Sequence, residues 1–225
     1  MRRVGKQRHL KHFGILVMLA LLQFACGMPE MGKCESSLSA GRYLMSSDCR
    51  PLTWGYELPV PFVYGNSLSQ DAIIAFNEAI DTWEKRTGIR LFSVIHENYP
   101  EYDGIEFNTN LNLIAFRSGP KWSQEPINGD PDKEPGKTVY YHDQNYLYNT
   151  DIHVNNGYAL SLDGRPETFD LISIAVHELG HTLGLDHTDD PGSVMYPQIM
   201  PGQKRREPSP ADIQAIRNVY LSILN

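Results

Sequence analysis

Residues 177–187 run H-E-L-G-H-T-L-G-L-D-H, and this segment constrains the fold more tightly than any other. Side chains four positions apart share one face of an α-helix, so a helix here projects His177 and His181 together. Gly184 can adopt a positive φ and end that helix, after which the chain can turn back and present His187. The segment therefore predicts a helix and a tight turn, with three imidazoles converging on one point.

Three neutral imidazoles can bind one Zn²⁺ and leave a fourth position for water, which is typical of catalytic zinc sites. Glu178 follows His177 directly, so it lies beside the expected metal position and not on it. That place suits a general base that acts on a metal-bound water. The sequence predicts a hydrolytic zinc site with His177, His181 and His187 as ligands and Glu178 as the catalytic base.

A second motif, S-V-M-Y-P, occupies residues 193–197. Together with H-E-x-x-H-x-x-G-x-x-H it resembles the metzincin zinc peptidases and, among them, the matrixins, or matrix metalloproteinases. The resemblance implies that Met195 forms a hydrophobic floor beneath the zinc without ligating it. It also implies an α+β fold: a twisted, mostly parallel sheet with one antiparallel edge strand, an active-site helix and a C-terminal helix.

The resemblance has implications for the substrate site, and the sequence departs from the family there. Tyr196, Pro197 and Ile199 would line the substrate pocket, but matrixins usually have a tyrosine where this chain has Ile199. The Pro-Arg-Cys-Gly segment that keeps family zymogens latent is absent from the sequence, so we expect no latency of that kind. The implied activity is that of a zinc metalloendopeptidase, a hydrolase that cleaves internal peptide bonds of protein or peptide substrates.

Matrixins often carry a structural zinc and calcium ions in addition to the catalytic zinc. The stretch Asp151–Asn155 resembles the strand that supplies one histidine, His153, to such a site. We expect one catalytic zinc and consider Ca²⁺ a candidate, although the fuller His-Gly-Asp loop of the family is missing. The side chains that could add ligands are His142, Asp130, Asp132 and Glu134.

Residues 1–27 have the pattern of a secretory signal peptide: a basic stretch, the apolar run Ile15–Leu22 and small residues near its end. Two hypotheses for its processing remain open. Signal peptidase would cleave before Met28, whereas Cys26 resembles the lipid-acceptor cysteine of bacterial lipoproteins. We expect an extracellular protein, with a cell-envelope lipoprotein as the alternative and Cys26 as its sole membrane anchor.

Residues 28–52 are Ser-rich and lack clear periodicity, which favours an N-terminal tether or strap before a domain at 53–225. Cys34 and Cys49 lie in this segment, and two cysteines of an exported protein are expected to form a disulfide. A loop of about 15 residues closed in this way contributes roughly 3 kcal/mol to stability.

The remaining patterns predict an alternation of helices and strands. Ser67 or Ser69 caps a first helix, Ser67 forms a capping box with Gln70, and Gly88 ends the helix. A second helix is expected at Phe169–Gly184, and the third begins with a capping box of Ser209 and Asp212. The expected strands are Trp54–Leu58, Ile89–Ile95, Asn112–Arg117, Thr138–His142 and Asp151–Asn155.

The charge and composition of the chain exclude several classes of partner. The formal net charge is −7, and outside residues 1–27 the chain carries 15 basic and 27 acidic side chains. Such a surface repels polyanions, so nucleic acid is not an expected partner. We also expect the protein to be a monomer. Two other functions stay open: a zinc-bound binding or adhesin module without activity, and an aminopeptidase whose third zinc ligand is a distant glutamate.

Overall fold

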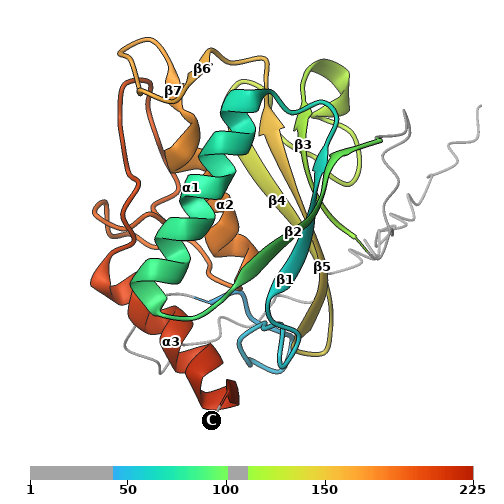
Figure 1. Cartoon of the computed structure of the whole chain (residues 1–225), viewed down its shortest axis with the longest axis vertical. Helices are drawn as coiled ribbons and strands as arrows, with labels where there is room; N and C mark the ends of the chain where they lie inside the picture. Colours follow the sequence, from blue (N-terminus) through green and yellow to red (C-terminus); the bar gives the residue numbers. More distant parts are fainter. Residues whose placement is uncertain (1–42, 101–110, 225) are drawn as a thin grey trace, which may run out of the picture. The chain divides into compact units, whose positions relative to one another are not determined.

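The computed structural model describes residues 43–100 and 111–224 (Figure 1). The helices are α1 (Gln70–Thr87), the 3₁₀ turn η1 (Gly119–Lys121), α2 (Leu171–Thr182) and α3 (Pro210–Leu224). The strands are β1 (Val60–Gly65), β2 (Phe92–Tyr99), β3 (Asn112–Arg117), β4 (Gly136–Asp143), β5 (Tyr146–Asn155), β6 (Leu160–Ser161) and β7 (Phe169–Asp170).

Five strands form a mixed sheet in the order β2-β1-β3-β5-β4. The strands β2, β1, β3 and β5 are parallel, whereas β4 at the edge pairs antiparallel with β5. This arrangement confirms the predicted α+β fold with a mostly parallel sheet and one antiparallel edge strand. Because β4 is at the edge, no strand within residues 43–100 and 111–224 pairs with the other side of its backbone.

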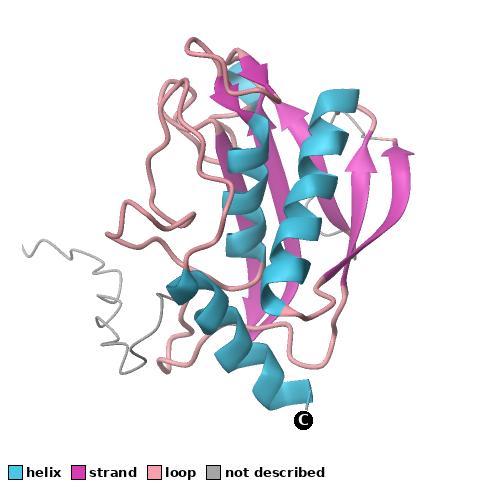
Figure 2. Ribbon diagram, turned by 60° about the vertical axis from the view of Figure 1, so that its left-hand side comes forward, coloured by secondary structure: helices cyan, strands magenta, loops and turns pink. Residues whose placement is uncertain are grey.

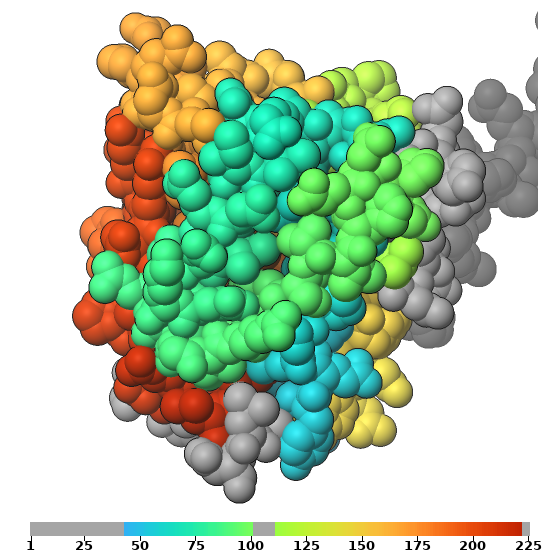
Figure 3. All heavy atoms as spheres, viewed as in Figure 1, coloured from blue at the N-terminus to red at the C-terminus, as the bar shows by residue number. Residues whose placement is uncertain are grey.

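Helices α1 and α2 pack side by side over one face of the sheet, and α3 lies beyond their lower ends (Figures 1 and 2). The indole of Trp83 on α1 is fully buried and donates from Nε1 to the carbonyl oxygen of Val176 on α2, at 2.9 Å. On the face shown in Figure 3, α1 and β2 are exposed together. The core therefore lies between the two helices and the sheet, and α2 is its most buried helix.

The ends of the helices test the capping predictions. Ser69 caps α1, because its hydroxyl accepts from the backbone N–H of Ala72, and Gly88 ends that helix at φ 74°. Because Ser69 is the N-cap and Gln70 is the first residue of the helix, the predicted Ser67–Gln70 capping box is wrong. The Ser67 hydroxyl accepts from Phe116 N on β3. The box at α3 is confirmed: Ser209 N donates to Asp212 Oδ2 (2.8 Å), and Asp212 N donates to the Ser209 hydroxyl (3.2 Å).

The first strand is not where the sequence indicated. Trp54–Leu58 is a turn, in which Gly55 has φ 57° and the backbone N–H of Glu57 donates to Trp54 O. The strand is β1, Val60–Gly65, which the prediction missed because it begins with Val-Pro and proline is rare inside sheets. Asn112 on β3 connects the two strands by donating from its side-chain amide to Pro61 O at 2.7 Å.

The stretch before β1 packs against the domain. Tyr43 and Leu52 are buried, and Leu44 N donates to the carbonyl oxygen of Gly184 at 2.9 Å. Two of the sequence predictions, the export signal and the cysteines Cys26 and Cys34, lie outside the described residues. Within the described ranges, none of the helices is both long and apolar enough to cross a membrane.

Candidate functional site

Helix α2 presents two of the three predicted histidines. Its N-terminus is fixed by Asp170, whose carboxylate accepts from the backbone N–H of Ser173 at 3.0 Å. The helix is apolar on most sides because α1 and the sheet enclose it, and His177 and His181 lie on one face of it. The helix ends at Thr182, and the turn through Gly184 (φ 90°) brings the chain back to His187.

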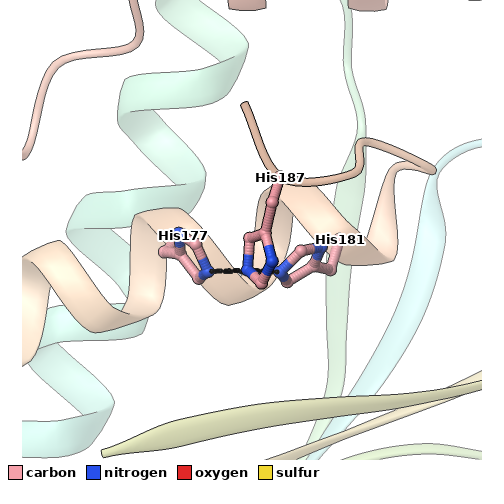
Figure 4. Close-up of side chains that lie close together, drawn as sticks. All are labelled: His177, His181 and His187. Carbon is pink, nitrogen blue, oxygen red and sulfur yellow. Dashed lines mark hydrogen bonds between the residues drawn. The ribbon is translucent and has the colours of Figure 1, made fainter. Parts of the chain in front are cut away.

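The three imidazoles converge as the sequence predicted (Figure 4). The Nε2 atoms of His177 and His181 are 3.1 Å apart, and both lie 3.2 Å from Nε2 of His187. A tetrahedral zinc ion with Zn–N bonds of about 2.0–2.1 Å places its nitrogen ligands about 3.3–3.4 Å apart. The spacing of the three nitrogens therefore fits a zinc ion.

The outer nitrogens of two rings show which tautomer is present. Nδ1 of His177 lies 2.7 Å from the carbonyl oxygen of Val194, and Nδ1 of His181 lies 2.8 Å from that of Leu185. A carbonyl only accepts, so each Nδ1 carries the hydrogen and each Nε2 of a neutral ring carries a lone pair. Two lone pairs at 3.1 Å repel each other unless a cation lies beside them, which makes this a metal-binding donor set.

All three rings favour the neutral form that metal binding requires. Burial holds the pKa of His177 well below its usual value, and the neighbouring His181 adds to this effect. Burial likewise lowers the pKa of His181 to about 4. Burial also lowers the pKa of His187, although the nearby charges of Asp186 and Glu134 oppose the shift.

Glu178 is 4% exposed and lies on the side of α2 that faces β4. Its Oε2 accepts a hydrogen bond of 2.7 Å from the hydroxyl of Thr138. Burial raises the pKa of Glu178 to about 7, and the hydrogen bond from Thr138 opposes that shift. A carboxyl with this pKa can both accept and release a proton near neutral pH.

A turn around Met195, the methionine expected to form a floor beneath the zinc, lies beneath α2. Met195 is 1% exposed, and a Cβ built on Gly180 would come within 2.3 Å of its sulfur, so the sulfur lies directly against the helix backbone. The backbone carbonyl of Met195 accepts from Thr188 N (3.1 Å), just after His187. Asp212 on α3 fixes the turn by accepting from the hydroxyl of Ser193 at 2.7 Å.

The residues predicted to line a substrate pocket follow this turn. Tyr196 and Ile199 are partly buried and Pro197 is exposed. Sequence reasoning missed Arg205, whose guanidinium carbon lies 5.2 Å from the ring centroid of Tyr196 and whose Nη1 donates to Gln198 O at 2.9 Å. Arg205 thus holds the segment 196–199 together, and no local pattern indicates this contact.

The other candidate metal ligands are not brought together. Among the described residues, the cluster of three or more His, Cys, Asp or Glu side chains that could hold a metal is His177, His181 and His187. His153 is buried on β5, and Asp130 pairs with Lys133 at 2.8 Å. Ca²⁺ binding therefore stays a prediction.

Two further residues beside Glu178 were not singled out by the sequence. Thr138 begins the expected strand Thr138–His142 and Gly136 precedes that strand, and no local pattern marks either residue as part of the site. Both lie on β4 and reach Glu178 only because the edge strand packs against α2. The sequence could identify Gly136 and Thr138 as neighbours of Glu178 only if the packing of β4 against α2 were already known.

Comparison with known proteins gives a family match and a set of relatives. The family model described as matrixin matches residues 63–221. Metalloendoproteinase 5-MMP of Arabidopsis thaliana is 26% identical over 215 residues, which cover 87% of this chain and 54% of that protein. Matrilysin of Felis catus is 26% identical over 209 residues, covering 91% of this chain and 69% of that protein.

A third relative is matrix metalloproteinase-16 of Rattus norvegicus, 28% identical over 204 residues. That alignment covers 87% of this chain but 31% of the relative. The chain thus spans about half of the plant relative and about a third of this one. The family match extends well beyond the histidine motif: it runs from within β1 to within α3 and includes the turn around Met195.

Proposed function

Because the chain belongs to the matrixin family, we propose that it is a zinc-dependent endopeptidase that hydrolyses internal peptide bonds of proteins. The observation that carries this proposal is the convergence of three imidazole Nε2 atoms within 3.2 Å of one another, beside the buried carboxyl of Glu178 on the same helix. In this proposal His177, His181 and His187 hold one zinc ion and Glu178 is the catalytic base.

The chain's own residues prepare the site for the metal. The carbonyls of Val194 and Leu185 orient the rings of His177 and His181, which fixes the direction of their lone pairs. Met195 supports α2 from below and does not ligate. When bound, zinc supplies Lewis-acid chemistry: it lowers the pKa of a coordinated water and polarises the carbonyl of the peptide bond to be cleaved.

Glu178 moves the proton. As a carboxylate it takes a proton from the attacking water, and as a carboxylic acid it delivers that proton to the nitrogen of the leaving amine. A pKa of about 7, which results from burial, makes both forms accessible near neutral pH. The carboxylate is also the form that a cation nearby favours, so the base form is available before the reaction.

The substrate lies extended along β4 in this proposal. One edge of β4 pairs antiparallel with β5, and no strand of the described residues pairs with its other edge. The segment Thr138–His142 of β4 passes beside α2. An extended peptide gains backbone hydrogen bonds by adding to such an edge. Tyr196, Pro197 and Ile199 would contact the side chain that follows the cleaved bond.

Export of the protein belongs to the same proposal. The signal peptide pattern at 1–27 supports secretion, with a lipid anchor at Cys26 as the alternative. The division into a tether at 28–52 and a catalytic domain at 53–225, and the Cys34–Cys49 disulfide, stay predictions. A zinc site that hydrolyses proteins would then act outside the cytoplasm, as a monomer.

The test is cleavage of internally quenched peptides with blocked ends by the protein from Met28 onward. Wild type, Glu178→Ala and the control Glu167→Ala are compared with and without a zinc chelator, and zinc content is measured for each. Glu167 is an exposed glutamate with no place in the site. We expect chelator-sensitive internal cleavage in the wild type and the control, and a loss of roughly 10²–10⁴-fold in Glu178→Ala with zinc retained.

The two other functions predict different results. One bound zinc per chain without cleavage across a diverse peptide set would contradict the proposal and favour the binding module. If the blocked peptides stay intact while the same peptides with a free amino terminus are cleaved, an aminopeptidase is favoured.

A further inference from the structure

The hydroxyl of Thr138 connects the edge strand to the carboxyl of Glu178. It lies 2.7 Å from Oε2 and 3.1 Å from the backbone carbonyl oxygen of Glu178. A hydroxyl has one hydrogen, and hydrogen bonds to an ionised carboxylate are the shorter and stronger ones. The main interaction is therefore the one with Oε2.

The other oxygen of the carboxyl lies against Gly136. A Cβ built on Gly136 would come within 2.5 Å of Oε1 and 2.8 Å of a methyl carbon of Ile174. Gly136 and Thr138 are two positions apart on β4, so they face the same side of the sheet. The strand thus holds the carboxyl by leaving space for one oxygen and donating a hydrogen to the other.

This contact matters because a glutamate side chain is flexible and its carboxyl can rotate about the terminal bond. Glu178 is 4% exposed, so little water is available to replace a missing donor. Catalytic groups lose much of their effect when they are misplaced by about an ångström. A single hydroxyl from the strand beside the proposed substrate is therefore well placed to fix the position of the base.

We propose that Thr138 is a positioning residue that holds the carboxyl of Glu178 in its reactive orientation through the Thr138 hydroxyl. The inference rests on the proposed function of Glu178 as the base. In this account the substrate pairs with the backbone of β4, whereas the side chain of Thr138 contacts neither zinc nor substrate and acts only through Glu178.

Two substitutions at Thr138 separate the hydroxyl from the shape of the side chain. Thr138→Val keeps the shape and removes the hydroxyl, whereas Thr138→Ser keeps the hydroxyl. The matched control is Thr150→Val. Thr150 lies on β5, opposite Tyr140 of β4, and its buried hydroxyl has no hydrogen-bond partner in the described part of the chain. All variants are assayed for kcat, KM and zinc content.

We expect kcat of Thr138→Val to fall roughly 10- to 100-fold, with KM and zinc content unchanged. Thr138→Ser should stay within about threefold of wild type, a change of about 0.6 kcal/mol or less, and Thr150→Val should behave as wild type. In a Glu178→Ala background, Thr138→Val should cause no further loss. Wild-type kcat in Thr138→Val, or equal losses in the valine and serine variants, would overturn the inference.

Crystal structures of the zinc-loaded wild type and of the Thr138→Val and Thr138→Ser variants provide a readout that does not depend on activity. The carboxyl of Glu178 should keep its place in the wild type and the serine variant and shift in the valine variant. If the wild type is inactive but the carboxyl shifts in Thr138→Val, the proposed function is refuted and the positioning role stays intact. An active wild type whose carboxyl stays in place in Thr138→Val would refute the positioning role alone.

Discussion

Gly184 combines a left-handed backbone with a close approach to another segment. Its φ is 90°, and a Cβ built there would come within 2.2 Å of the carbonyl oxygen of Leu52. Backbone atoms cannot move aside as the end of a flexible side chain can. Since His187 follows three residues later, any displacement of Gly184 is transmitted to the third imidazole.

We therefore expect Gly184→Ala to destabilise the protein more than Gly88→Ala. Gly88 also has a positive φ, 74°, but its Cβ would meet nothing within 4 Å. The backbone cost of about 1–2 kcal/mol should appear in both variants, while Gly184→Ala should lose roughly 3 kcal/mol or more and bind zinc more weakly. Urea unfolding and zinc competition measure the two effects; equal losses would contradict the role of Leu52.

His153 is a buried polar residue whose effect on the stability of the folded protein depends on pH. It is 1% exposed, and neither ring nitrogen has a hydrogen-bond partner among the described residues. Burial lowers its pKa to about 3, with the charge of Arg117 adding to the shift. In the unfolded chain the imidazole takes up a proton below about pH 6.5. The folded state does not, so stability is lost as pH falls from 6.5 toward 3.

The variant His153→Leu removes this dependence. As pH falls from 7.5 to 5, the free energy of unfolding of His153→Leu minus that of wild type should increase by about 2 kcal/mol. Urea unfolding at both pH values measures it, on zinc-free and on zinc-loaded protein, so that release of the catalytic zinc is not mistaken for the effect. An advantage that is constant with pH would show that His153 does not titrate as proposed.

At the scale of elements, the C-terminal end of α2 is held by segments from both ends of the chain. Helix carbonyls in the last turn lack intrahelical donors. Here Trp54 Nε1 donates to Thr182 O at 2.7 Å, and the Tyr220 hydroxyl donates to Leu183 O at 3.0 Å. These contacts fix the point where the chain leaves α2 toward His187.

We predict that Trp54→Phe costs more than Trp122→Phe. Both indoles are buried, but Nε1 of Trp122 has no hydrogen-bond partner in the described residues, whereas that of Trp54 satisfies Thr182 O. The difference in free energy of unfolding should be about 1–3 kcal/mol. Zinc affinity should fall in Trp54→Phe alone. Thermal and urea unfolding with zinc titration check this, and indistinguishable variants would refute it.

The elements also show what a single sequence can and cannot predict. The zinc motif and the capping box at Ser209 depend on residues within a few positions of each other, so their patterns were sufficient. The strand β1 was missed because Pro61 argues locally against a strand, and its place depends on Asn112 of β3. Thr138 and Glu178 are 40 positions apart, so no local sequence pattern predicts their contact.

At the scale of the whole molecule, the site depends on residues that the sequence assigned to a tether. Tyr43 donates from its hydroxyl to Ala215 O on α3 at 3.0 Å, and Leu44 N donates to Gly184 O. Tyr43 and Leu52 contribute buried surface to the core. The part of 28–52 from residue 43 onward is thus packed against the domain.

A chain that begins at Thr53 should therefore be much less stable than one that begins at Met28. Loss of Tyr43, Leu44 and Leu52 removes buried apolar side chains, each of which contributes about 1.5–3 kcal/mol when fully buried. It also leaves Gly184 O without its hydrogen-bond donor, Leu44 N. We expect the shorter chain to unfold at a lower temperature and to bind zinc more weakly, because the turn that carries His187 loosens.

The predicted disulfide must be separated from this effect, because truncation also removes Cys34 and Cys49. Both chains are therefore compared with and without a reductant, and Cys49→Ser in the longer chain serves as the control. If packing of residues 43–52 is the cause, the longer chain should keep its advantage when reduced. Equal stability and zinc affinity of the two reduced chains would show that a domain beginning at residue 53 is sufficient.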